Sequence, residues 1–158
     1  MFLFVAFLVP LLLSGADEKS KESQTQTQPQ TQTSIMLTNE VVQQGTSSGI
    51  KDVIAKVITD KKEWEELWKR HVSVLVPQPP LPPVDFDSEV LVVAFAGEKR
   101  TSGYRVIVKS VTAEGNDVMV TYKLTEPPEN GFTLQVLTQP FVILKVEKPP
   151  GTVKLVRE

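Results

Sequence analysis

The stretch EVLVVAFAGEKRTSGYRVIVKSVTAEGNDVMVTYKL, residues 89–124, decides the fold class of this chain. It opens with residues 90–96, which are apolar at every position. Such a run predicts a strand that is buried on both faces. Two alternating strands follow, at 104–111 and 118–125, with a turn between them. We therefore expect three consecutive strands at the centre of a sheet, the first two joined by a hairpin loop over residues 97–103.

Strand signals continue on both sides of this stretch. They are short β-branched or alternating runs bounded by Gly, Pro, Asn and Ser, and they cover residues 35–43, 50–59, 132–137, 141–146 and 153–157. Residues 138–140 interrupt two of them, which predicts a bulge or a crossing between sheets. The expected fold is mainly β (α+β): an antiparallel sheet or sandwich of about eight short strands with one packed amphipathic helix.

The helix is expected directly after the strand at 50–59. Asp60 can cap its N-terminus, and Glu63 three residues later completes a capping-box pattern. The face at i, i+3, i+4 and i+7 carries Trp64, Leu67, Trp68 and His71. Because His71 lies on this apolar face, we interpret it as a half-buried structural residue rather than a catalytic base.

Residues 76–84, VPQPPLPPV, separate the helix from the central strand. This many prolines exclude a helix or a central strand and predict a stiff, extended, polyproline-like connector. The segment also has the PxxP spacing of polyproline ligands. Asp85 and Asp87 follow it. Paired carboxylates can bind Ca²⁺ or act on a sugar, but we interpret these two as turn and strand-capping residues.

The N-terminus reads as a targeting segment. Residues 2–13 are almost wholly apolar, too short to span a bilayer, and followed by small residues, so we predict a signal peptide over 1–16. The Gln/Thr-rich residues 17–34 predict a disordered tether, and 35–158 a single β-rich domain. A lipobox-like Leu-Ser-Gly is followed by Ala16 where the lipidated cysteine would stand, so no lipid anchor is expected.

Composition excludes several function classes. The net charge of −2 gives no basic excess for general nucleic-acid binding. The chain has no cysteine, hence no disulfide, no thiolate nucleophile and no Cys-ligated zinc. With one histidine and no G-x-S-x-G elbow, no catalytic triad is indicated. We expect no enzymatic activity, no cofactor and no metal site.

Several segments in order resemble the C-terminal domain of PrcB-type protease-complex subunits, a family of exported bacterial domains. The matching pieces lie between residues 60 and 147 and comprise 63–68, 84–86, 90–97, 101–104, 118–123, 127–128 and 137–140. The resemblance implies a noncatalytic, exported module that associates with a secreted protease. It transfers no catalytic residue.

Two loops hold the candidate partner-binding residues. They are Thr101, Ser102, Gly103 and Tyr104 in the first loop and Gln139, Pro140 and Phe141 in the second. We expect Gly103 to occupy a backbone position with positive φ or a bulge. The first loop also faintly resembles the Thr-Thr-Gly-Tyr loop of chagasin-type cysteine-protease inhibitors. The Asn-Pro that precedes that loop in the inhibitors is absent here, where Lys99 and Arg100 stand.

Three functional hypotheses follow. The leading one is an exported, noncatalytic protein-interaction module, located in the periplasm, the cell envelope or outside the cell, whose protein partner is a secreted protease. The second is a loop-based, chagasin-like protease inhibitor. The third and most remote is a hydrolase that uses Asp85 and Asp87, or His71. The oligomeric state is not indicated by the sequence.

Overall fold

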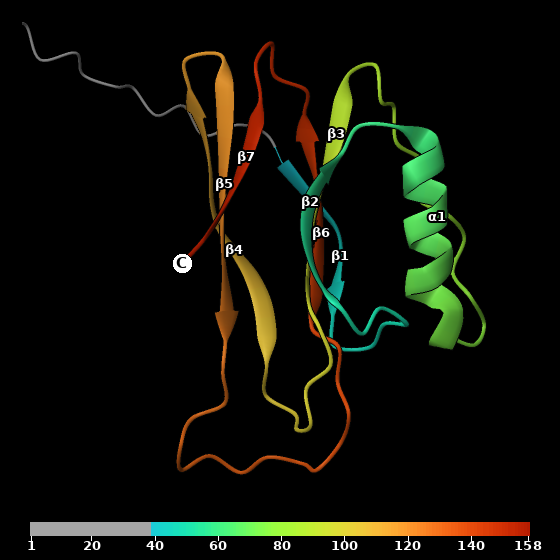
Figure 1. Ribbon diagram of the computed structural model, residues 1–158, viewed down its shortest axis with the longest axis vertical. Coiled ribbons are helices and arrows are strands. Elements are labelled where there is room, and N and C mark those ends of the chain that lie inside the picture. Colours follow the sequence, from blue (N-terminus) through green and yellow to red (C-terminus); the bar gives the residue numbers. More distant parts are fainter. Residues whose placement is uncertain (1–38) are drawn as a thin grey trace, which may run out of the picture. The chain divides into compact units, whose positions relative to one another are not determined.

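The computed structural model describes residues 39–158, which form two β-sheets and one α-helix (Figure 1). The elements in chain order are β1 (Asn39–Gly45), β2 (Val53–Ile58), α1 (Lys61–His71), a 3₁₀ turn η1 (Val72–Val74), β3 (Glu89–Ala96), β4 (Arg105–Glu114), β5 (Asp117–Thr125), β6 (Phe141–Glu147) and β7 (Val153–Arg157). Four predictions concern residues outside this range. They are the signal peptide (1–16), the tether (17–34), the absence of a lipid anchor at Ala16 and the start of the domain at residue 35.

The first sheet has the strand order β1-β6-β3-β2, and all its neighbours are antiparallel. β3 lies inside this sheet, and its residues from Val90 to Phe95 are buried. Leu91, Val93 and Phe95 pack toward α1, whereas Val90 and Val92 pack against the second sheet. The prediction that this apolar run is covered on both faces is therefore confirmed.

The second sheet has the order β4-β5-β7. β4 and β5 form an antiparallel hairpin, and β7 adds to β5 in parallel. In Figure 1 the layers follow one another as second sheet, first sheet and α1. The predicted mainly β sandwich with one packed helix is confirmed, although the β5–β7 pair makes the second sheet mixed rather than purely antiparallel.

The prediction of a hairpin loop at residues 97–103 is wrong. β3 pairs with β2 and β6, while β4 belongs to the other sheet. Residues 97–104 therefore cross from the first sheet to the second, and residues 89–124 do not form the centre of one sheet. The physical reason is that β2 and β6 take both edges of β3 in the folded chain, so β4 lies in the layer that covers the face of β3 opposite α1.

The predicted strand at residues 132–137 is also wrong. This segment has no strand pairing, so the described chain has seven strands rather than about eight. It belongs to the long connection 126–140, which returns from β5 in the second sheet to β6 in the first. The sheet-to-sheet crossing predicted for 138–140 is thus found, but it involves the whole connection.

An irregularity in β4 explains why its sequence alternates poorly. The register with β5 shifts between Val108 and Ser110, which is a β-bulge. Val106 and Val108 face the core before the bulge, and Val111 faces it afterwards. The extra residue in the bulge reverses which of two successive side chains faces the core. Apolar residues before and after the bulge therefore point into the same core.

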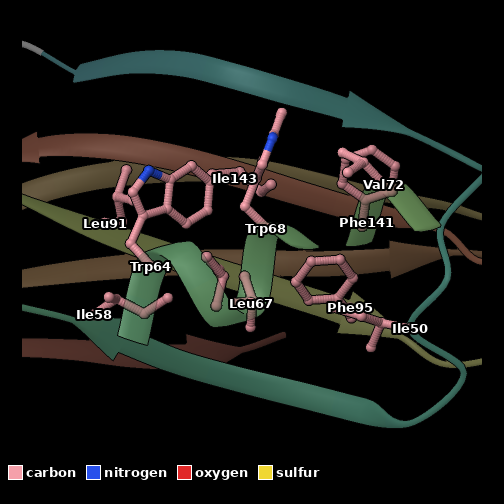
Figure 2. Packing of buried hydrophobic residues seen from close by; sticks show 11 residues of the cluster. Ile50, Ile58, Trp64, Leu67, Trp68, Val72, Leu91, Phe95, Phe141 and Ile143 are labelled. Carbon is pink, nitrogen blue, oxygen red and sulfur yellow. The ribbon is translucent and has the colours of Figure 1, made fainter. Parts of the chain in front are cut away.

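The predicted helix is confirmed with its cap. The Asp60 side chain accepts a hydrogen bond from the Glu63 backbone N–H at 2.9 Å. The reciprocal half of the capping box is replaced, because the Glu63 carboxylate pairs with Lys56 of β2. All four residues of the predicted apolar face, Trp64, Leu67, Trp68 and His71, are buried. Figure 2 shows the two tryptophans and Leu67 against side chains of the first sheet.

The proline-rich residues 76–84 run back beside α1; after a bend at 76–77, residues 78–84 are extended as predicted. They are held there by two indole N–H groups. Trp64 Nε1 donates to the Pro82 carbonyl at 3.2 Å, and Trp68 Nε1 donates to the Pro79 carbonyl at 3.3 Å. The connector therefore satisfies the polar end of each buried tryptophan, which a simple spacer would not do.

Candidate functional site

Two loops cross between the sheets at the same end of the sandwich, the lower end in Figure 1. We call residues 97–104 the first crossing loop and residues 126–140 the second crossing loop. Lys99 and Thr138 exchange backbone hydrogen bonds of 2.7 and 2.9 Å, and the Thr138 hydroxyl donates to the Thr101 carbonyl at 3.0 Å. The structure thus brings together the two sequence segments that hold the predicted site residues.

Ser102 connects the two crossing loops a second time. Its backbone N–H donates to the Leu134 carbonyl at 3.0 Å, and its hydroxyl accepts from the Leu134 N–H at 2.9 Å. This reciprocal pair fixes the middle of the second crossing loop, which has no strand partner. The predicted Ser102 therefore has a clear structural role, which is to hold its neighbouring loop in place.

Gly103 has a φ of +98°, which confirms the expected positive-φ position. A Cβ atom on this residue would lie 2.7 Å from Pro127 Cβ in the second crossing loop. Tyr104 follows and is half-buried, with the Lys99 ammonium 5.5 Å from the centre of its ring. Gly103 therefore contributes a backbone conformation that other residues rarely adopt, and no reactive side chain.

We predict that Gly103→Ala costs about 1–3 kcal/mol of unfolding free energy, since it adds backbone strain and a contact with Pro127. Gly115→Ala is the matched control, because Gly115 also has a positive φ (63°) but no atom within 4 Å of a Cβ. Urea unfolding of both variants separates strain from contact. Equal losses in the two variants would contradict a role for the Pro127 contact.

The other predicted residues differ in their accessibility. Phe141 is 2% exposed and stacks on Phe95 with ring centres 5.6 Å apart, and Pro140 is also buried. Gln139 is partly exposed, and its amide donates to Glu98 at 3.2 Å. That these residues contact a partner stays a prediction. Of the three, Gln139 has the accessible side chain, whereas Phe141 supports the loop from the core.

The sequence reasoning missed four exposed apolar side chains on the second crossing loop. Phe132 is 92% exposed, Leu134 57%, Val136 46% and Leu137 58%. Their alternating pattern was assigned to a strand, whose apolar side would face the core. The Ser102 pairing instead holds the segment at the surface. One signal could have found them: the run follows the turn-rich PPENG at 127–131 with no partner strand of its own.

His71 is fully buried and both its ring nitrogens have partners. Nδ1 lies 2.9 Å from the Ser48 hydroxyl, and Nε2 lies 3.0 Å from Gln43 Oε1. Burial lowers the pKa of His71 from 6.5 to about 4, so the ring is neutral at pH 7. The His71 ring packs edge-on against the Phe141 ring, with the ring centres 4.4 Å apart. His71 therefore lies on the buried face of α1 as predicted, but it is fully buried rather than half-buried.

Asp85 has the predicted turn role. Its carboxylate accepts from the Ser88 hydroxyl at 2.8 Å and from the Asp87 N–H at 3.2 Å, and its carbonyl accepts from the Glu89 N–H at 2.7 Å. These bonds shape the entry into β3. Within residues 39–158, no group of three or more His, Cys, Asp or Glu side chains could hold a metal ion. In the same range, no helix has the length and apolar character needed to cross a membrane.

The described site is thus a pair of hydrogen-bonded crossing loops, one from β3 to β4 and the other from β5 to β6, with exposed apolar side chains on the second. Residues 90–147 match the PrcB C-terminal family model. The matched PrcB C-terminal segment begins in β3, ends in β6 and contains both crossing loops. The resemblance found in the sequence is therefore confirmed for this segment. The pieces quoted at 63–68 and 84–86, from α1 and the β3 entry, lie outside it. No curated protein and no solved structure matches the chain.

Proposed function

We propose that this chain is an exported, noncatalytic protein-interaction module that associates with a protease-containing complex through its two crossing loops. The observation that carries the proposal is the exposure of Phe132 and its apolar neighbours within the segment that matches the PrcB C-terminal family model. The PrcB resemblance supports a protease as the partner. The apolar residues 2–13 and the polar residues 17–34 support export and a tethered position.

The second crossing loop has the chemistry of a binding surface. Four large apolar side chains within residues 132–137 face solvent, and contiguous exposed apolar surface marks interaction sites. Fully burying one such side chain contributes roughly 1.5–3 kcal/mol. Hydrogen bonds to the first crossing loop at Ser102, Lys99 and Thr101 hold the segment in place, which reduces the entropy lost on binding.

The test is recovery of a protease from envelope extract by the purified chain. We expect the wild-type protein to retain a protease identified by mass spectrometry and by peptidase activity, and Phe132→Ser to retain at least tenfold less. Val156→Ser is the matched control, because Val156 is 42% exposed on β7 opposite Thr121, in the middle of β5 rather than in a crossing loop. Equal recovery by the Phe132 variant, or no protease with any chain, would reject the proposal.

The inhibitor hypothesis has one observation in its favour. Thr101–Tyr104 and Gln139 lie on adjacent loops at one end of a sandwich, the placement that a loop-based inhibitor needs. It predicts inhibition of a papain-like or subtilisin-like enzyme at micromolar concentration, lost in Tyr104→Ala. Retention of an active protease in the extract experiment argues against it, because an inhibitor would block the bound enzyme.

A further inference from the structure

The connector between α1 and β3 shows a three-residue pattern of burial. Pro79 and Pro82 are half-buried against α1, while Pro77, Pro80 and Pro83 are all exposed. A polyproline II helix has three residues per turn, so residues three apart lie on one ridge. The five prolines fix their own φ near −65° and keep the preceding residues out of the α region. Pro80 and Pro83 therefore lie on one outward ridge, whereas Pro77 precedes it at a bend of the chain.

The inner side of the connector is fixed at two points. The accepting carbonyls belong to Pro79 and Pro82, one polyproline turn apart, and the donors are the indole nitrogens of Trp68 and Trp64. Both tryptophans are buried in the core, at 6% and 1% exposure. The connector is thus held in its extended form by rigid groups before any partner arrives.

The connector and the η1 turn before it expose large apolar side chains to solvent. Val74 is 54% exposed, Val76 97% and Leu81 36%. These form a second group of exposed large apolar residues, separate in sequence from the one on the second crossing loop. Residues 72–84 contain no charged side chain. A partner that binds here therefore uses apolar contact and hydrogen bonds to backbone carbonyls or to the exposed Gln78 amide, rather than ion pairs.

We propose that the outward ridge of Pro80 and Pro83, together with Leu81, is a preformed polyproline ligand for a partner protein with an aromatic-lined groove. Such grooves hold prolines between aromatic rings and donate hydrogen bonds to polyproline carbonyls. The hydrogen bonds from Trp64 and Trp68 already hold the segment in its extended form. It therefore loses less conformational entropy on binding than a free peptide of the same sequence. The ridge lies outside the PrcB C-terminal segment and is a second site, independent of the crossing loops.

The test compares two surface variants of the full chain. In the first, Pro80→Gln and Pro83→Gln are combined; these residues face outward, so thermal unfolding should stay close to wild type. The second is Phe132→Ser, which alters the crossing-loop surface instead. Each immobilised chain is incubated with envelope extract, and bound protein is eluted with the nine-residue peptide VPQPPLPPV (residues 76–84).

We expect a protein that the peptide elutes from wild type and from Phe132→Ser, and at least tenfold less from the double proline variant. The aromatic fluorescence of that purified protein should change on addition of the peptide. Equal elution from the double variant, no peptide-eluted protein, or an eluted protein without an aromatic response would overturn the proposal. Loss of protease recovery in Phe132→Ser alone bears on the crossing loops and leaves this result unaffected.

Discussion

Replacing Trp64 by alanine is expected to lower the free energy of unfolding by roughly 3–5 kcal/mol. Trp64 is 1% exposed and belongs to the core between α1 and the first sheet, with its ring centre 5.1 Å from that of Trp68. The change would empty a large volume and leave the Pro82 carbonyl without its donor. Urea unfolding at pH 7.5, followed by far-ultraviolet circular dichroism, measures the loss.

Trp64→Phe is the matched control. It keeps most of the apolar burial and removes the indole N–H, so we expect a smaller cost, about 1–2 kcal/mol. The variant leaves Trp68 as the single tryptophan of the chain, which makes its fluorescence a direct probe of the same core. Near-wild-type stability of Trp64→Ala would contradict the packing described for α1.

Acidification is expected to destabilise the protein through His71. Burial lowers its pKa from 6.5 to about 4 in the folded state. Between these two values the unfolded chain binds a proton that the folded chain does not. The contribution is therefore fully present above pH 6.5 and is lost as the pH falls toward 4, by roughly 3 kcal/mol in total.

The measurement is unfolding free energy against pH for wild type and His71→Gln. We expect the variant to be less stable at pH 7, because Ser48 and Gln43 lose a partner, but to show a shallower decline from pH 6.5 to 4. Parallel curves would contradict the assignment. If the variant fails to fold, an NMR titration of the wild-type ring decides the matter, since His71 is the only histidine. Its ring shifts should stay constant down to about pH 5.

Local patterns predicted most of the elements but not their partners. The burial of β3 follows from its uniformly apolar sequence, and the apolar face of α1 follows from the helical spacing of its apolar residues. Both signals lie within a single segment of the chain. Whether β4 joins β3 in one sheet depends on which strands occupy the edges of β3. Those strands are β2, which precedes β3 in the sequence, and β6, which follows it. The sequence of residues 97–103 contains no signal of which strands pair with β3.

The site was predicted in part for a similar reason. The turn residues Thr101 to Gly103 have a local signature, and the structure places them beside Thr138 and Gln139. Residues 132–137 have a strand pattern, and an alternating apolar sequence looks the same whether its apolar side meets a core or solvent. The pairing of Ser102 with Leu134, far apart in the chain, decides the outcome.

The strand order has a consequence for how the chain folds. β3, the most apolar strand, pairs with β2 before it, but its other edge stays open until β6 arrives, after the whole of the second-sheet hairpin. β7, the last strand, then completes the second sheet next to β5. Such non-local pairing slows folding and prolongs exposure of an adhesive strand edge. An emerging chain therefore exposes the open edge of β3 until β6 has been synthesised and has paired with it.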